Sequence, residues 1–491
     1  MHSGSPGRLA ALLVVLLLAG AGKAGAMSLE EYVRHYLSQS ARLSMAQKAA
    51  RRAALLAEIA DDRYKTSLQS VLTGQDNLVG TSGTNIVPNA TGTGVLFQPY
   101  STHFRSKTRG HATSLNQTLG LGSTLSLRFN ESRTQFDNDT GDSANRDHSV
   151  HLNHALWRNF GGALEDLRSE QAGLEQEAAR QEADDMQLQE CLAAGRLYLD
   201  AWFLQEQAKL YDLSLKDARE MRDLFTRLYK GRHVQKIEYL RARQDFLTRE
   251  NLFADRRQAV RQARLVLENG IGRSVPPVLQ EPALKVIEAG LQEAAPATGL
   301  PALKKYDLRR QAAEAGIGVA RQTARSDVNL TLSAGRAKLP SSGDILGTST
   351  ERDYMGVSLS LSLPLRDRSR EVAVHRAVVD HEIAGERLRE AERESRKSLD
   401  TAVSTLGHLR RRSRTVADQV GVAEQQLAEA KVLVKSSRYD LTNYILDRTA
   451  ATAKKIEYLE NRLRVMTTIL SIRQLTSQAP AWCPQNGAVK G

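Results

Sequence analysis

Between Gly356 and Leu365 apolar and polar residues alternate without interruption. The apolar set is Val357, Leu359, Leu361, Leu363 and Leu365, and the polar set is Ser358, Ser360 and Ser362. A period of two is typical of a β-strand with one apolar and one polar face. From Arg366 charged residues with helical spacing follow, and no Gly or Asn turn intervenes. The pattern therefore predicts a strand that continues directly as a helix.

Four other stretches alternate in the same way, at residues 66–74, 119–129, 148–157 and 328–334. The segment Ser114–Asn130 fits either one long strand or a hairpin, because all of its leucines are at odd-numbered positions and would lie on one face in either case. Polar, turn-rich stretches lie between the strands and predict long loops, at Val79–Gly94, Phe136–Asp147 and Ser341–Asp353. Strands of about ten residues with one apolar face are typical of a membrane barrel wall, and the same alternation suits a half-buried soluble sheet.

The segment after Arg366 carries a second pattern, with apolar or small residues at alternating intervals of three and four. This seam is Leu406, Leu409, Ser413, Val416, Val420, Ala423, Leu427, Ala430 and Val434, continued after a break by Ile445, Thr449, Thr452, Ile456, Leu459, Leu463, Met466 and Leu470. Such a heptad seam predicts left-handed coiled-coil packing. A helix from Arg366 to Val434 would be about 100 Å long at 1.5 Å per residue, which favours a spacer or a tube.

The second half of the chain repeats the plan of the first, which indicates an internal tandem repeat. Residues 27–268 contain an entry helix, strands at about 66–157 and a long helical hairpin at about 158–268. Residues 306–478 repeat this order, with strands at about 328–365 and a hairpin at about 366–475. A Pro- and Gly-containing linker, 269–305, joins the halves, and we expect 479–491 to be a disordered tail.

The first 26 residues are typical of a secretory signal peptide, with Arg8 before an apolar run and small residues at the end. An uncleaved anchor is the alternative, although the eleven-residue run Leu9–Ala19 is shorter than the ~20 residues of a spanning helix. The formal charge of +12 is interleaved with acids and lacks a basic patch with aromatics, so nucleic acid is not expected as a partner. We expect Cys191 and Cys483 to be unpaired thiols.

No phosphate loop, nucleophile elbow or paired-cysteine motif is present, so neither an enzyme nor a cofactor is predicted. The spacing of His148, His151 and His154 invites a metal site. In a strand, however, His151 faces away from the other two, so we predict no metal site there. In lipid every backbone polar group needs an internal partner, and a few strands leave two open edges. Copies of the chain would have to close a barrel together, with Pro364 ending the hydrogen-bond ladder at the strand-to-helix junction.

These features, in this order, resemble the TolC-like outer-membrane efflux proteins over nearly the whole chain after the signal. The strongest piece is the Ser/Leu–Pro–Leu segment that leads into a helix at Leu361–Leu365. "LNHALWRNFGG" is similar to that family's entry into its first hairpin. Ala155 stands in place of a proline, and Trp157, at this strand-to-helix junction, stands in place of a leucine. The resemblance implies an α+β membrane protein: a trimeric outer-membrane β-barrel with four strands per protomer, 12 in all, continuing into a coiled-coil periplasmic tunnel.

By the same resemblance the chain is a passive exit duct in the outer membrane lipid. It would form a homotrimer and work with a periplasmic adaptor protein and an inner-membrane pump of the RND or ABC type, in a tripartite efflux pump or a type I secretion system. Its cargo would be drugs, metal ions or polypeptide, and the sequence does not choose. The alternative is a secreted coiled-coil structural protein, which accounts for the heptads and leaves the alternating strands without a role.

The two breaks between long helices resemble the tips of the family's tunnel. In "SRYDLTNYILD" the candidates for a gate are Arg438, Asp440, Tyr444 and Asp447. The resemblance places Asp447 on an acidic site, where three copies would raise one another's pKa and attract cations, and the alternative is an ordinary surface pair with Arg448 or Lys454. Candidates for adaptor docking at the two tips are Gly231, Arg232, His233, Lys236, Tyr439 and Leu441, and the alternative is a solvated turn. Gly231 is expected to permit the first turn.

Overall fold

A computed structural model describes residues 26–62, 64–88, 95–136, 143–288, 301–340, 349–363, 368–436 and 438–484. The predicted signal peptide lies, except for Ala26, outside the described residues, as does Pro364. The chain divides into two compact units. The first unit comprises residues 1–51, 178–306 and 387–491, and the second comprises residues 52–177 and 307–386.

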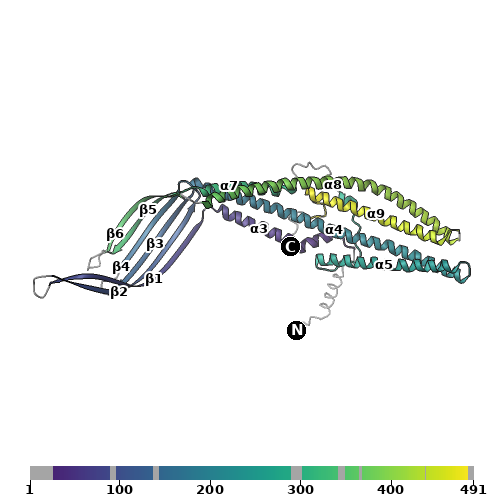
Figure 1. Cartoon of the computed structure of the whole chain (residues 1–491), viewed down its shortest axis with the longest axis horizontal. Coiled ribbons are helices and arrows are strands. Elements are labelled where there is room, and N and C mark those ends of the chain that lie inside the picture. Colours follow the sequence, from purple (N-terminus) through teal and green to yellow (C-terminus); the bar gives the residue numbers. More distant parts are fainter. Residues whose placement is uncertain are drawn as a thin grey trace, which may run out of the picture. The chain divides into compact units, whose positions relative to one another are not determined.

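The second unit contains a six-stranded antiparallel sheet in which each strand pairs with its neighbour in sequence (Figure 1). The strands are β1 Thr66–Pro88, β2 Val95–Leu119, β3 Ser123–Phe136, β4 Ser143–Ala155, β5 Asp327–Pro340 and β6 Ser349–Ser362. The expectation of about four strands was therefore wrong. The extra pair arises because the segment Ser114–Asn130 is a hairpin, whose turn contains Gly122 at φ 70°. A Cβ atom at Gly122 would lie 2.0 Å from the carbonyl oxygen of Asn159, so this turn requires glycine.

All three predicted loops are shorter than expected, and β4 begins at Ser143, inside the second of them. The strand β1 continues to Pro88 and β2 begins at Val95, so most of Val79–Gly94 is strand. Since β3 pairs with β2 only as far as Ser106, the outer parts of β1 and β2 pair with each other as a two-stranded ribbon. Similarly, β6 begins at Ser349, inside the third predicted loop. Backbone pairing between neighbouring strands thus extends through sequence that is too polar to predict a strand.

The helices have matching lengths in the two halves of the chain. Helices α3 (Ala41–Asp61) and α7 (Lys304–Ala324) have 21 residues each. Helices α4 (Ala163–Lys230) and α8 (Arg368–Lys435) have 68 each, and α5 (Lys236–Ile271) and α9 (Leu441–Thr476) have 36 each. The remaining helices of the described ranges are α2 (Leu29–Gln39), α6 (Leu284–Glu288) and two short 3-10 turns, η1 (Phe160–Gly162) and η2 (Pro301–Leu303).

The predicted heptad seam coincides with the buried face of α8. Leu406, Leu409, Val416, Ala430 and Val434 are buried, and the seam positions between them are partly buried. On α9 the predicted seam residues Met466 and Leu470 are buried, as expected. Near the start of α9, however, the buried positions lie one residue earlier than expected, at Leu441, Tyr444, Arg448 and Ala451. Sequence periodicity missed this shift because Arg448 is charged and scores as a surface residue.

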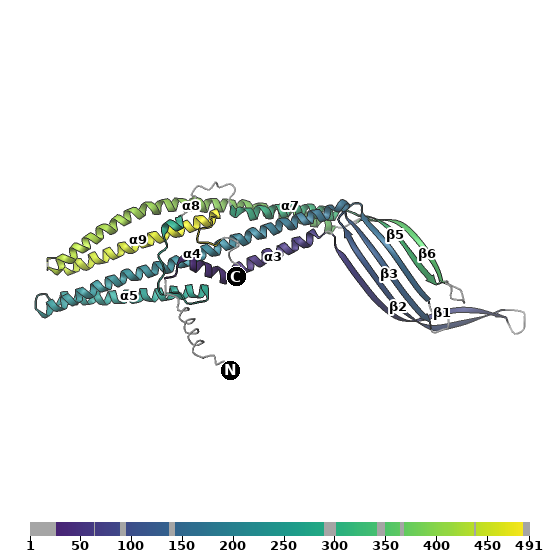
Figure 2. The ribbon, with the colours of Figure 1, turned by 180° about the vertical axis from the view of Figure 1, so that it is seen from behind.

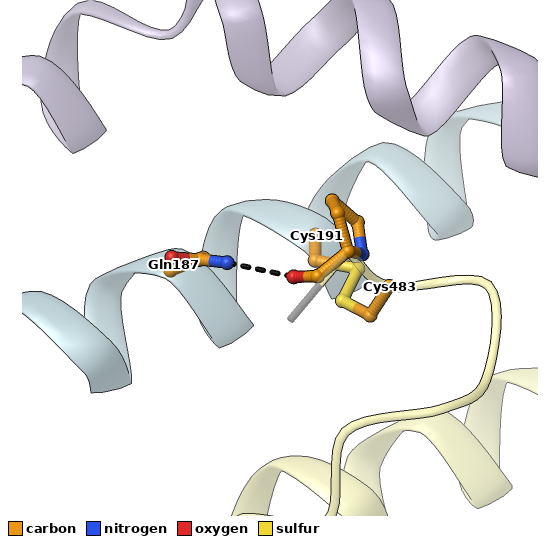
Figure 3. Close-up of a disulfide and its surroundings, with 4 residues drawn as sticks. Gln187, Cys191 and Cys483 are labelled. Carbon is orange, nitrogen blue, oxygen red and sulfur yellow. Dashed lines mark hydrogen bonds between the residues drawn. A yellow bond between two sulfur atoms is a disulfide. The ribbon is translucent and has the colours of Figure 1, made fainter. Parts of the chain in front are cut away.

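The main core of the first unit includes the end of the chain. Residues of α2, α4, α5, α8 and α9 share one cluster with Trp482 and Cys483. Cys483 forms a disulfide with Cys191 of α4, with Cα atoms 6.1 Å apart (Figure 3). Beside it, the Gln187 amide donates to the carbonyl oxygen of Pro484 at 2.8 Å. The expectation of free thiols was therefore wrong, and the tail is packed up to Pro484 instead of disordered.

Candidate functional site

The sheet of the second unit has one apolar and one polar face, and the strand register sets both. Residues that are paired directly opposite each other lie on the same face. One row of such residues crosses all six strands and is wholly apolar: Leu68, Leu115, Leu127, Val150, Ala334 and Met355. A neighbouring row lies on the other face and is polar or glycine: Ser67, Asn116, Ser126, His151, Ser333 and Gly356. We call these the apolar face and the polar face.

The apolar face is bare in the single chain. Leu359 is 66% exposed, Leu68 71% and Met355 89%. On the polar face, by contrast, the small residues Ser126 and Ser149 are buried. Val71 is an exception, an exposed apolar residue on the polar face. A continuous patch of exposed leucine, valine and methionine on one face needs an apolar cover, because soluble monomers rarely leave one in water.

Charged residues bound the apolar face towards the hairpin ends that are remote from the helices. Arg336 forms an ion pair with Asp353 at 2.6 Å, and Arg146 with Glu131 at 2.9 Å. Lys338 lies 3.8 Å from Glu351. From Val328 to Arg336 β5 runs about 27 Å along its length.

The three histidines of β4 are divided between the two faces. His148 pairs with Phe129 and His154 with Ser123, both on the apolar face. His151 pairs with Ser126 on the polar face. No cluster of three or more metal-binding side chains occurs among the described residues.

The junction between β4 and α4 contains Trp157, whose side chain is 58% exposed. The backbone N–H of Leu156 donates to the carbonyl oxygen of Val328 at 2.7 Å, and Arg158 pairs with Asp327 at 3.1 Å. The start of α4 is thereby attached to the first residues of β5.

In the first unit, the α4–α5 and α8–α9 turns share a small core at one end, which we call the tip (Figure 2). In the α4–α5 turn Gly231, Arg232, His233 and Lys236 are all exposed. Arg232 is the residue of this turn in the left-handed conformation, at φ 60°. A Cβ atom at 231 would lie 2.7 Å from the exposed His233 ring, which would have to move to make room.

In the α8–α9 turn the predicted residues have distinct roles. Asp440 caps α9 and accepts hydrogen bonds from the backbone N–H groups of Thr442 and Asn443 at 2.9 and 3.3 Å. Leu441 is buried, and Arg438 is exposed. The Tyr439 hydroxyl donates to Asp447 at 2.8 Å. The half-buried Asp447 thus has a partner other than Arg448 or Lys454, the two that its surface alternative named.

Next to this turn, a network of polar side chains joins the four helices α4, α5, α8 and α9. Asp217 of α4 accepts from the Tyr444 hydroxyl and from Lys431, each at 2.5 Å. Arg448, only 2% exposed, lies 3.4 Å from Asp217 and also pairs with Asp245 of α5. Arg249 extends the network, 3.3 Å from Asp245. Tyr444 is fully buried, so within one chain it contacts this network.

The protonation states of the network follow from these contacts. Burial, with the hydrogen bond to Asp217, raises the pKa of Tyr444 above its usual range and keeps its hydroxyl a donor. Burial alone would lower the pKa of Lys431, but the hydrogen bonds and charges of Asp217 and Glu220 outweigh it and raise that pKa. Hydrogen bonds from Lys435 and Lys431 lower the pKa of Glu220. At neutral pH these shifts keep Glu220 and Lys431 charged and Tyr444 neutral.

Sequence reasoning missed Asp217, Asp245 and the buried role of Arg448. Asp217 and Asp245 lie 231 and 203 residues from Arg448 in the chain, so no local pattern connects them. The sequence did contain one signal of the buried role of Arg448. Its position, four residues after Tyr444 and seven after Leu441, places it on the same face of α9 as these two buried residues.

Residues 299–440 match the family model described as outer membrane efflux protein. The resemblance inferred from the sequence is thereby confirmed. No curated protein matches the chain in sequence. None of the helices in the described parts of the chain has the length and apolarity that a membrane crossing needs.

Solved structures of outer-membrane channels share this fold. The outer-membrane channel OprN is 15% identical, with a TM-score of 0.61, over 93% of this chain and 91% of that chain. The CmeC outer membrane channel of Campylobacter jejuni is 12% identical, with a TM-score of 0.65, over 91% and 85%. VceC, an outer membrane protein of Vibrio cholerae, is 13% identical, with a TM-score of 0.63, over 91% and 95%.

Proposed function

We propose that the protein is a passive outer-membrane exit duct, gated at the tip of its helices. The observation that carries this proposal is the two-faced sheet. Its apolar face is exposed, its polar face lies opposite, and within the described residues β1 and β6 each pair with one neighbour only. In lipid such open edges are unfavourable, because their unpaired N–H and C=O groups have no water to bond.

We infer that three copies close these edges, as the resemblance implies. Because the number of strands is even, β1 and β6 run in opposite directions. β6 of one copy can therefore pair antiparallel with β1 of the next copy, as neighbouring strands do within the sheet. Three sheets of six strands would form an 18-stranded barrel instead of one of 12. At about 4.8 Å between strands and a tilt near 40°, that barrel is about 36 Å across, one and a half times the width that 12 strands give.

The helices of the second unit offer a matching contact between copies. Three large residues of α3, Leu55, Leu56 and Ile59, are each more than half exposed. In the same unit a groove of about 570 Å³ is lined by alanines and Gly316 of α7 and by alanines of α8. We propose that α3 of a neighbouring copy occupies this groove, because small residues allow close approach. Such a head-to-tail contact closes a ring when the rotation is threefold.

The tip is the proposed gate and docking surface. Asp447 and Tyr439 supply polar groups there, and the buried network around Asp217 holds the two hairpins of one chain together. Exposed apolar residues Ile237 and Leu240 follow the basic α4–α5 turn on α5. We propose that this surface receives a helical hairpin of a periplasmic adaptor, which couples the duct to an RND or ABC pump. Docking would pull the hairpins apart and open the entrance.

Membrane fractionation and planar-bilayer recording test the proposed duct. We expect detergent to be required for extraction, a trimer that dissociates only on heating, and ion conductance after reconstitution. A monomer, or a fibre soluble without detergent, would contradict the duct and support the structural-protein alternative.

A further inference from the structure

The hairpin of β1 and β2 continues far beyond the other strands of the sheet, as Figure 2 shows. Asn77 and Ser106 lie in the last row in which β3 takes part. Beyond that row, eleven residues of each strand, 78–88 of β1 and 95–105 of β2, pair with each other. We call this part the ribbon. At the usual rise of a strand it is about 36 Å long.

The ribbon lacks the usual protection of an exposed strand edge. Within the described residues neither of its long edges pairs with a further strand. An isolated two-stranded hairpin is only marginally stable in water, and bare edges pair readily with other chains. Charged side chains commonly prevent this, yet Arg105 is the only Lys, Arg, Asp or Glu of the ribbon. Pro88 and Pro99 remove one backbone donor each and leave the rest of both edges available.

In the proposed trimer, the ribbons of the other copies can supply the missing partners. The three ribbons leave one barrel mouth, at the hairpin ends of the sheets. Because β1 and β2 run in opposite directions, β1 of one ribbon and β2 of the next are antiparallel when the ribbons lie side by side. Each ribbon is about as long as the 36 Å width of the proposed barrel, so ribbons that lean inward reach one another.

We propose that the three ribbons join edge to edge and cap the outer mouth of the duct. This inference rests on the proposed function, because it needs three copies around one barrel. Three ribbons contribute six strands, and even a barrel of about eight strands has an interior that side chains just fill. Six strands therefore leave no open channel. The duct thus has a second closure, separate from the gate at the tip, and this closure opens when the shared edges part.

Cross-linking through single cysteines tests the contact between copies. Ser82 lies in the ribbon, Gln69 lies on the polar face of the same strand, and both are exposed. The two native cysteines are joined in a disulfide and do not compete for the reagent. Around a barrel about 36 Å across, the three copies of residue 69 are about 31 Å apart, too far for a short bismaleimide. We expect S82C to form covalent dimers on denaturing gels and Q69C to remain monomeric.

Labelling of intact cells tests the closure itself. The probe is a maleimide attached to a polyethylene glycol that is too large to cross the outer membrane, and its target is Q69C in the barrel interior. With the ribbon intact we expect no labelling. A second variant carries Q69C and an Asn-Gly turn in place of residues 79–104, and we expect it to be labelled from outside. Heat-modifiable trimer is measured in both samples, so that misfolded protein is not counted.

The outcomes separate this inference from the duct. Equal labelling of Q69C with and without the ribbon, whether high or low, overturns the cap. Failure of S82C to cross-link within heat-modifiable trimers also overturns it, and the ribbons are then free to bind a partner outside the cell. In both cases the trimer, and with it the proposed duct, remains. A soluble monomer rejects both proposals.

Discussion

The hydroxyl of Tyr444 on α9 donates a hydrogen bond of 2.5 Å to Oδ2 of Asp217 on α4, so the two helical hairpins are joined through a partly buried carboxylate. Arg448 and Lys431 approach the same carboxylate. Removing one partner of a buried charged group costs more than the pair contributes, because the other charge stays buried without compensation. Asp217 is therefore the point at which the tip is most sensitive to substitution.

We predict that D217N opens the tip more than Y444F does. D217N weakens three contacts and leaves the almost fully buried Arg448 with Asp245 alone, at a cost of about 3–5 kcal/mol. Y444F removes one hydrogen bond to a charged group, worth about 1.5–3 kcal/mol. Planar-bilayer recordings should show higher conductance for both variants, in that order. Y229F, at a partly exposed tyrosine of the same tip, should conduct like the parent. Parent-like conductance of folded D217N would show that the network does not hold the gate.

We predict a plateau of closed-state conductance between about pH 5 and pH 9. The folded pKa of Glu220 is lowered, so its contribution is complete above its ordinary value near 4.3 and is lost as pH falls through the lowered pKa. The folded pKa values of Lys431 and Tyr444 are raised, so their contributions are complete below about 10 and are lost as pH rises through the raised values. Conductance measured across pH should rise below about pH 4. E220Q should remove this acid rise, and a rise centred near pH 7 in the parent would contradict the assignment.

Much of the fold follows from two periods in the sequence. The alternation of Val357, Leu359 and Leu361 with serines fixes the two faces of β6, because a strand reverses its side chains at every residue. The spacing of three and four from Leu406 to Val434 identifies the buried side of α8, because a helix returns to one face at that interval. Both patterns are local and strong.

The remainder depends on contacts that no local pattern encodes. The leucine parity continues through the β2–β3 turn, so it does not distinguish one strand from two, and only the positive φ of Gly122 marks the reversal. Cys191 and Cys483 are separated by 292 residues, and their pairing needs the tail to pack against α4. The network around Asp217 was missed because buried charges resemble surface charges until their partners are known.

We predict that lysine is tolerated on one face of β6 and not on the other. Leu359 lies on the apolar face, 66% exposed, and Ser360 lies next to it on the polar face. A lysine in the middle of the lipid-facing wall costs about 2–4 kcal/mol, whereas one facing the lumen keeps its water. L359K should reduce the amount of heat-modifiable trimer in outer membranes, and S360K should not. Equal effects of the two substitutions would contradict the assignment of the faces.

We predict that the disulfide stabilises the packed tail. C191S/C483S should lower the free energy of unfolding by about 2–5 kcal/mol, and the thermal midpoint should fall accordingly. Trp482, 4% exposed, gives a local signal, since its fluorescence should shift to the red when the tail detaches. Dithiothreitol should reproduce the drop in the parent and leave C191S/C483S unchanged. If the reductant lowers both midpoints equally, it acts elsewhere than on this bond.

We predict that the charge of Asp447, and not its hydrogen bond, sets cation selectivity at the tip. In a trimer three Asp447 carboxylates would lie around the entrance and attract cations. D447A removes both the charge and the acceptor of the Tyr439 hydroxyl. D447N removes the charge and keeps an acceptor. Y439F keeps the charge of Asp447 and removes the hydrogen bond.

Reversal potentials in a tenfold salt gradient distinguish these cases, on a scale whose limit for a perfectly cation-selective pore is about 59 mV. D447A and D447N should move the reversal potential towards zero by similar amounts, and Y439F should leave it near the parent value. D418N, at an exposed carboxylate of α8, controls for a general loss of negative charge. Should Y439F shift the potential as far as D447N does, the residue acts by holding the turn in shape. An unchanged potential in both Asp447 variants would place the selectivity elsewhere in the duct.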